Sequence, residues 1–368
     1  MNRSPDKKLL KLLDWYIIKK FLGTYFFSIA LIVAISVVFD FNEHIDKLKD
    51  ASLSEVLFDY YLNFIPYFAN LFSPLFVFIA VIFFTSKLAD NSEIIAMFST
   101  GLSFRRLMVP YLLSATIIAL LSFFLGSYII PRGSITRIGF ENLYMRKSNP
   151  HSARNIQLEV SKNVIAYMER YEHYNRTGYR FSLDKFEDKK LVSHLTARSL
   201  EYDTLSTEPF HWKLKNYMIR NLVDDQEKIQ RGSELDTIIY MEPSDFLIHR
   251  GQQETMTSPE LRKYIKRQKQ RGLGNIKEFE IEYHKRIAMV FASYILTIIG
   301  FSLSSRKRKG GMGLYLGIGI GLSFGYILFQ SISSSFAING TMSAAWAEWM
   351  PNIFYFLIAA YLYYKAPK

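Results

Sequence analysis

The sequence predicts an α-helical membrane protein with six transmembrane helices, three on each side of an inserted, extracytoplasmic all-β domain that is jellyroll-like. Two observations carry this prediction. A charged side chain at the bilayer centre costs roughly 2.5–3.5 kcal/mol on insertion scales, so long runs without charge are candidate spans. Residues 131–286 are charged and carry alternating apolar patterns, which favour a folded domain outside the membrane. Five runs contain no Asp, Glu, Lys or Arg: 21–39, 60–86, 107–131, 287–305 and 310–347.

The last charge-free run is too long for one helix and is expected to hold parts of two spans. The dipeptide Asn339-Gly340 is a turn signal that divides it, and a sixth span then extends from about Ala345 to Tyr364. The chain is thereby divided into a first membrane section, residues 1–130, and a second membrane section, residues 287–368.

The distribution of basic residues predicts the orientation of the spans. With the N-terminus inside, the short inside segments hold 15 Lys and Arg residues, four of them in the loop 305–312. The outside loops 40–59 and 336–348 hold only Lys47 and Lys49. Because Lys and Arg concentrate in cytosolic loops, both termini are expected in the cytosol and the large domain outside. The net charge of +12 therefore reflects topology, and no nucleic-acid partner is expected.

The section 131–258 is typical of antiparallel strands. Apolar and polar residues alternate over 179–184 and over 212–215, and the apolar face then shifts near Asn216, which suggests a bulge. Further strand-like runs are 163–171, 191–202 and 235–241. We expect a one-domain β sandwich or jelly roll, whose open edges either need protection or accept a partner strand.

A basic linker region is predicted over 259–286, with a helix from Pro259 to Arg271. Proline directly after Thr257-Ser258 is typical of a first helical turn. Two interpretations of this helix stay open. It is either a solvated linker with its cations near lipid phosphates, or a basic rim that meets an anionic amphiphile.

The sequence carries none of the common catalytic motifs. It has no G-x-x-x-x-G-K-[ST], no H-E-x-x-H and no G-x-S-x-G. There is no Cys, and the seven His residues are scattered, so we expect no metal site and nominate no catalytic residue. This chain is therefore not expected to hydrolyse ATP through a P-loop.

A short amphipathic helix is predicted over residues 90–101, between the second and third spans. Asp90 is expected to cap its N-terminus, and Gly101 to end it in the left-handed conformation. Glu93 in the first turn would favour the positive helix end by about 0.3–1 kcal/mol. The helix either lies with its apolar residues in the lipid interface or docks on a partner protein.

Glycines recur every four positions along the fifth span. Such a stripe lets another helix backbone approach closely. It predicts either packing between spans of this chain or a separable contact with another subunit, as a lateral gate would need. The stripe consists of Gly313, Gly317, Gly321 and Gly325.

Several segments resemble the lipopolysaccharide-export permeases LptF and LptG. The entry to the first span, Leu13-Asp14-Trp15-Tyr16, resembles the L-D-x-Y opening of that family and favours an LptG-like member. The loop from Ser92 to Gly101 resembles the family's S-E-[IL]-x-x-M-x-x-x-G, and the stretch 191–199 resembles a turn and strand of its outside domain. The arrangement of three spans, a β domain and three spans covers essentially the whole chain.

The resemblance implies a non-catalytic permease subunit of an ABC transporter in the bacterial inner membrane. Such a subunit extracts lipopolysaccharide and passes it to a periplasmic bridge of LptC-like and LptA-like β-jellyrolls. The implied partners are a cytosolic LptB-like ATPase dimer, which binds ATP and Mg, and a paralogous LptF-like permease. The large domain would be periplasmic, and the first and fifth spans would line the cavity.

The resemblance also assigns roles to residues. The helix 90–101 becomes the coupling helix that docks on the ATPase. Some members carry a basic residue near the position of Asp40, so Lys47, Lys49 or the linker helix would have to supply a cation here. The docking candidates are Asp90, Ser92, Glu93, Ile94, Met97, Gly101, Arg105 and Arg106. The substrate-facing candidates are Asp40, Lys47, Lys49, Arg262 and Lys266.

Two other classes of function remain open. A membrane-anchored scaffold of an envelope assembly would tolerate loss of the helix 90–101. A membrane-embedded enzyme acting on an envelope lipid would be active as an isolated chain, without ATP or a second permease.

Overall fold

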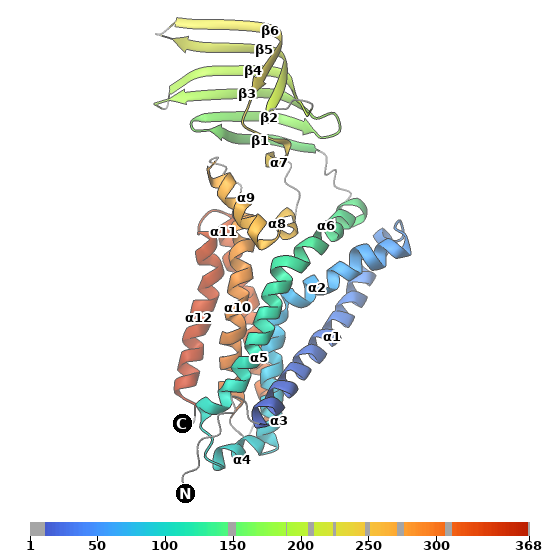
Figure 1. The fold of residues 1–368 in the computed structure, drawn as a ribbon, viewed down its shortest axis with the longest axis vertical. Coiled ribbons are helices and arrows are strands. Elements are labelled where there is room, and N and C mark those ends of the chain that lie inside the picture. The colour runs from blue at the N-terminus through green and yellow to red at the C-terminus, as the bar shows by residue number, and fades with distance from the viewer. Residues whose placement is uncertain are drawn as a thin grey trace. The chain divides into compact units, whose positions relative to one another are not determined.

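The computed structural model describes residues 12–145, 152–188, 190–204, 210–223, 226–246, 251–270, 276–305 and 311–366. It forms two compact units (Figure 1). The first comprises Met1–Met145, Glu254–Ser258 and Lys277–Lys368, and the second comprises Arg146–Gln253 and Pro259–Ile276. The basic residues 306–309 of the predicted loop 305–312 lie outside the described residues.

The first unit is a bundle of long apolar helices. Five described helices are long and apolar enough to cross a membrane: α1 (Leu12–Leu48), α3 (Ser73–Asp90), the continuous helix that begins with α5 (Phe104–Phe124), α10 (Lys277–Ser304) and α11 (Gly311–Ile338). A sixth helix, α12 (Ala344–Tyr364), is not among the five, because Glu348, Asn352 and its tyrosines lower its mean hydropathy. The six-span count therefore stays a prediction.

The second charge-free run is not one helix. It is divided into a π-helical segment, η1 (Glu55–Tyr61), then α2 (Leu62–Leu71) and α3, with a break at Phe72. Pro74 has no N–H to donate to the carbonyl of Asn70, so the helical ladder is interrupted there. Only α3 among these segments is long and apolar enough to span.

The third helix extends well beyond the predicted boundary at residue 131. After α5 the chain continues as η2 (Leu125–Ile129), α6 (Ile130–Phe140) and η3 (Glu141–Met145), all in the first unit. α6 buries Ser134, Arg137 and Phe140, and it packs on α2 and η1. The predicted end of the linker differs as well. α9 (Ser258–Gln270) agrees with the expected helix, but α10 already begins at Lys277.

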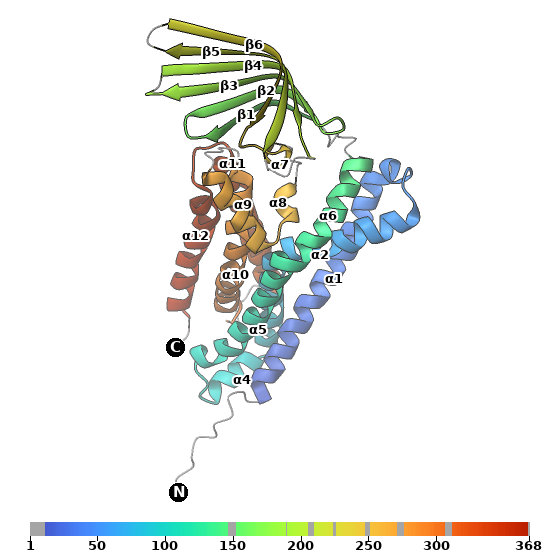
Figure 2. The same ribbon diagram turned by 45° about the horizontal axis from the view of Figure 1, so that its top comes forward.

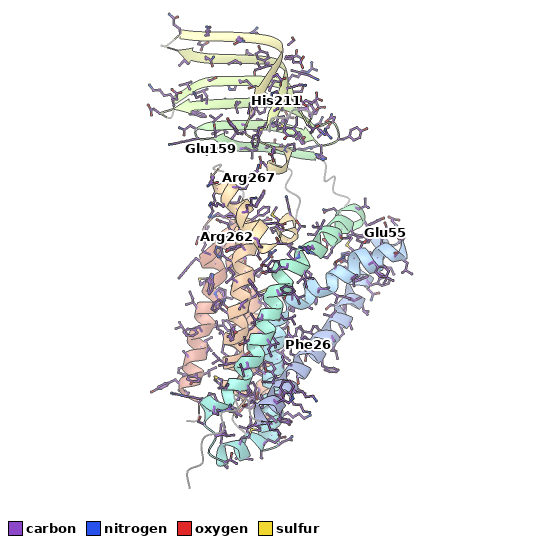
Figure 3. The ribbon with its side chains drawn as sticks, viewed as in Figure 1. Phe26, Glu55, Glu159, His211, Arg262 and Arg267 are labelled. Carbon is purple, nitrogen blue, oxygen red and sulfur yellow. The ribbon has the colours of Figure 1, made fainter. Side chains whose placement is uncertain are left out.

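Helix α10 is central to the bundle and packs on α3, α5 and α12. Small residues on α10 allow close packing, and Asn352 of α12 donates to the carbonyl of Ala288 at 2.9 Å. By contrast, only 17% of the apolar window of α1 and 22% of that of α11 is buried inside this chain. Phe26 illustrates this outward face of α1 (Figure 3). These two helices thus present most of their surface to lipid or to another protein.

The second unit contains one six-stranded antiparallel sheet in which every strand pairs with its neighbours in the sequence. A jelly roll needs two sheets and long connections, so the jellyroll part of the prediction is not confirmed. The strands are β1 (Ser152–Ser161), β2 (Val164–Glu172), β3 (Thr177–Glu187), β4 (Lys190–Tyr202), β5 (His211–Val223) and β6 (Gln226–Ile238). Two short helices follow, α7 (Pro243–Phe246) and α8 (Gln252–Thr255).

The sheet bends along one line that crosses its strands (Figure 2). Asn155, Arg180 and Asn216 lie on this line and adopt the left-handed conformation, with φ of 51°, 52° and 52°. The predicted shift of the apolar face on β5 is present, since Leu214 and Tyr217 are both buried. It is not a bulge, because the same register with β4 and β6 holds on both sides of Asn216. A local change of backbone conformation produces the bend.

The apolar face of the bent sheet forms the core of the second unit. Trp212 is fully buried beside Tyr171, and its indole N–H donates to the carbonyl of Met241 at 3.0 Å. Helix α9 adds Leu261 and Gln268 as buried residues. Its remaining face is exposed and basic, as Arg262 and Arg267 show (Figure 3).

Candidate functional site

The short helix α4 (Glu93–Ser99) lies between α3 and α5, where the sequence predicts a coupling helix. Asp90 is not its cap, because α3 continues through this residue. Ser92 occupies the cap position with φ 63° and makes no capping hydrogen bond through its side chain. Gly101 has φ +87° and its N–H donates to the carbonyl of Phe98 at 2.9 Å, which is the expected glycine end of the helix.

The two faces of α4 have different surroundings. Ile94 is 1% exposed and packs into the core of the bundle, with Met97 and Phe98 partly buried against the same core. Ile95, Ala96 and Ser99 form the exposed face, and Ile95 is 47% exposed. An exposed apolar side chain on a short helix anchored by Ile94 is suited to enter a groove of a partner. The sequence alone did not nominate Ile95 for this face.

Glu93 already has partners within the chain. Its carboxylate accepts a hydrogen bond from the side-chain amide of Asn91 at 3.1 Å and interacts with the hydroxyl of Tyr16 on α1. The side chain is half-buried, so a carboxylate oxygen can still meet a cation of another protein. Asp90 and Arg105 are exposed nearby.

Arg106 is occupied differently from the predicted docking role. It lies on α5 and forms a two-pronged ion pair with Asp14 of α1, with N–O distances of 2.8 and 2.5 Å. Asp14 is buried, and Arg106 is about one-third exposed. The pair joins the first and third spans at their α4 end. Asp14 is the Asp of the L-D-x-Y opening, so the ion pair gives this residue a structural role.

The glycine stripe faces outward over most of α11. A Cβ added at Gly313, Gly317 or Gly321 would meet no atom of the described chain within 4 Å. Only Gly325 of the stripe is approached, by the hydroxyl of Tyr355 at 3.0 Å from such a Cβ. The close approach inside this chain is instead at Gly319, where a Cβ would lie 2.3 Å from a methyl group of Ile82. The stripe is therefore accessible to a helix of another protein.

The substrate-facing candidates do not gather at one place. Asp40 is a structural acceptor, because the hydroxyls of Tyr60 and Tyr61 each donate to it at 3.1 Å. Lys49 is exposed and pairs with Asp46 at 2.6 Å, and Lys47 is exposed. Arg262 and Lys266 are exposed on α9, which belongs to the second unit.

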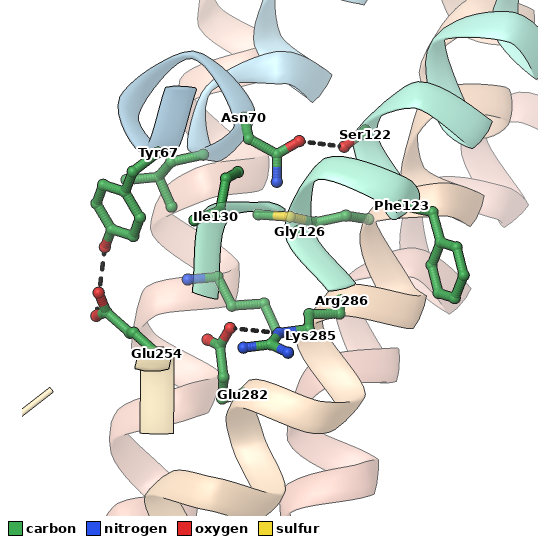
Figure 4. A pocket seen from close by; sticks show the side chains of 12 residues that line it. Tyr67, Asn70, Ser122, Phe123, Gly126, Ile130, Glu254, Glu282, Lys285 and Arg286 are labelled. Carbon is green, nitrogen blue, oxygen red and sulfur yellow. Dashed lines mark hydrogen bonds and ion pairs between the residues drawn. The ribbon is translucent and has the colours of Figure 1, made fainter. Parts of the chain in front are cut away.

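A buried charge cluster that the sequence reasoning missed lies in the first unit, and Figure 4 shows two of its members, Tyr67 and Glu254. Arg137 of α6 contacts Glu141 and Glu254, both at 2.6 Å, and its guanidinium stacks on Tyr67 at 4.1 Å. Burial raises the pKa of the Glu254 carboxyl above its ordinary value, against the opposing charge of Arg137. The i, i+4 spacing of Arg137 and Glu141 was the available sequence signal.

A second arginine holds the same short segment, residues 254–258. Arg286 of α10 bonds to Glu282 at 2.8 Å and donates to the carbonyl of Met256 at 2.9 Å and to the hydroxyl of Ser258 at 3.2 Å. Both arginines are buried, and Arg286 lines a cavity of about 40 Å³. Arg137 and Arg286 thus fix residues 254–258 to α6 and α10, respectively. We call residues 254–258 the strap.

The described residues contain no group of three or more His, Asp or Glu residues that could hold a metal ion. Long apolar helices that precede and follow a β sheet in the sequence define a multi-pass membrane protein. Residues 15–365 match the family described as "Lipopolysaccharide export system permease LptF/LptG". The chain belongs to this family, which covers nearly its whole length. No curated protein matches the chain.

Proposed function

We propose that this protein is a permease subunit of an ABC transporter that extracts lipopolysaccharide from the bacterial inner membrane. ATP would be bound and hydrolysed by a cytosolic LptB-like dimer, and the lipid would pass to a periplasmic β-jellyroll bridge. An LptF-like permease would complete the membrane part, with an LptG-like role for this chain. Family membership supports this assignment, and the division of α4 into an anchored and an exposed face carries its mechanism.

In this mechanism α4 transfers a movement of the ATPase to the bundle. Ile95 and Ser99 would contact the ATPase together with Glu93, while Ile94 holds the helix on the core that α1, α3 and α5 share. The open glycine stripe of α11 and the outward face of α1 would line the cavity and contact the second permease.

The test uses two variants in the α4 face. Ile95→Asp and Glu93→Lys are expected to weaken co-purification of the ATPase at least tenfold, because each places an unfavourable charge in the contact. Lys228→Glu, which reverses an exposed charge on β6 of the second unit, is the matched control and should co-purify normally. Normal co-purification and normal ATP-driven lipid release by both variants would refute the assignment. A scaffold would tolerate both variants.

A further inference from the structure

The bend of the sheet gathers arginines on one face. Neighbouring residues of a strand normally point to opposite faces. At the bend, however, buried positions are separated by two residues: Met168 and Tyr171 on β2, and Ala197 and Leu200 on β4. The residues between them therefore share the face opposite the apolar core. Four strands carry Arg154, Arg170, Arg180 and Arg198 to this line.

These side chains line a hollow of about 640 Å³, which we call the bend groove. Asn155, Glu169 and Tyr179 complete its lining. The volume lies in the range of about 300–1,000 Å³ that is usual for small-molecule sites. All four arginines are exposed, and Glu169 is the one acid of the lining, so the groove is positively charged.

Acidic neighbours offset this charge only in part. Arg180 pairs with Glu169 at 2.8 Å, and Arg170 pairs with Glu172 at 3.1 Å. The Arg170 guanidinium also lies over the ring of Tyr179, 5.1 Å from its centre. In the described part of the chain, Arg154 and Arg198 have no ion pair.

The strand register places like charges opposite each other. Arg154 is the direct register partner of Arg170 on the neighbouring strand. Arg180 and Arg198 face each other in the same way, because the pairs Tyr179–Ser199 and Phe181–Ala197 flank them. Like charges at such positions destabilise a sheet. An anion between the guanidinium groups would remove this repulsion, and guanidinium groups match the oxygens of phosphate in two-pronged geometry.

We propose that the bend groove binds the phosphorylated sugars of a glycolipid headgroup. The size of the groove exceeds what a single phosphate needs, and its charged lining excludes acyl chains, which the apolar core on the other face would suit better. The inference rests on the proposed function, because lipopolysaccharide supplies such a headgroup. It assigns to the β domain a contact with the polar end of the substrate.

The test measures binding of a soluble glucosamine disaccharide that carries two phosphates and no acyl chain. Full-length protein in zwitterionic nanodiscs is titrated by calorimetry. The double variant Arg154→Glu/Arg198→Glu is expected to bind about tenfold more weakly or worse, because it loses two charge-assisted contacts. The matched control Lys162→Glu/Lys228→Glu changes two exposed lysines outside the groove and should bind as the unchanged protein does.

Three results of the disaccharide titration would overturn the proposal. They are equal binding by the groove variant and the control, equal binding of the unphosphorylated disaccharide, and inorganic phosphate binding as tightly as the bisphosphate. Binding to phosphatidylglycerol vesicles that is lost in the groove variant, without binding of the disaccharide, would also overturn it in favour of membrane docking. Co-purification of the ATPase is measured on the same preparations. If the ATPase co-purifies normally while the groove variant binds the disaccharide bisphosphate as tightly as the unchanged protein, the groove assignment fails. The transporter assignment then stands.

Discussion

The ion pair between Asp14 and Arg106 allows a quantitative test of how the inner end of the bundle is held together. Removing one partner of a buried pair costs about 3–5 kcal/mol when the other charge stays buried. Asp14 is 2% exposed, whereas the Arg106 side chain is 32% exposed. Arg106→Ala and Asp14→Ala should therefore lower the free energy of unfolding by different amounts. Arg106→Ala leaves the buried carboxylate without two hydrogen bonds and is expected to cost about 3–5 kcal/mol.

Asp14→Ala is expected to cost less, about 1.5–3 kcal/mol, because the guanidinium can turn into water after it loses its partner. The double variant should be less destabilised than Arg106→Ala alone, since it leaves no buried charge behind. Equilibrium unfolding of the purified protein in mixed micelles, followed by circular dichroism, measures all three. Additive costs, or a larger loss for Asp14→Ala than for Arg106→Ala, would refute the reasoning.

Three further predictions concern other contacts. Gly319→Ala should lower stability by about 1–3 kcal/mol because the added Cβ would meet Ile82. Gly317→Ala places its Cβ in open space and should be neutral or stabilising by up to about 1 kcal/mol. Thermal unfolding measures both effects. The raised pKa of Glu254 means that this carboxyl stabilises the folded strap most at low pH, and that this contribution is lost as pH rises above its ordinary pKa of 4.5. Corrected hydrogen exchange of the strap should therefore quicken as pH rises through this range, and Glu254→Gln should abolish that dependence. Asp40→Leu should cost about 1–3 kcal/mol by leaving two tyrosine hydroxyls without an acceptor, and Asp40→Asn clearly less, as thermal unfolding will show.

Each strand-like run in the sequence overlaps an observed strand, but β1 was not predicted, and the ends of helices and strands were predicted poorly. Charge-free runs locate the part of a helix that lies in hydrocarbon, but a helix can continue beyond it. α6 carries Arg137 and η3 begins with Glu141, and these charges made the segment look like part of the outside domain. Their charges are instead satisfied within the first unit, by each other and by Glu254. Only the folded structure shows such long-range partners.

The candidate site was predictable where the signal was local. The helix 93–99 and its Gly101 end follow from residues that are neighbours in the sequence. The ion pair that removes Arg106 from the docking face joins residues 92 positions apart, and no local pattern points to it. The bend of the sheet lies between these cases. The shift of the apolar face near Asn216 indicated the bend on β5 alone. The alignment of the bend across the sheet depends on the register of the neighbouring strands.

Under the proposed function, the contacts of α1 indicate how this helix would move during transport. Polar cross-links fix the helix at both ends, through Asp14 to Arg106 and through Asp40 to two tyrosines of η1. Between these ends most of its surface is not covered by this chain. A movement of α4 would reach the first end directly, since Glu93 interacts with Tyr16 on the same helix. Because the hydrogen bonds of Asp40 hold the other part of the helix, a movement of the Asp14 end would pivot α1 about Asp40 as a rigid body. Such a pivot would displace the uncovered face between the two cross-links, where a substrate or a partner helix would lie.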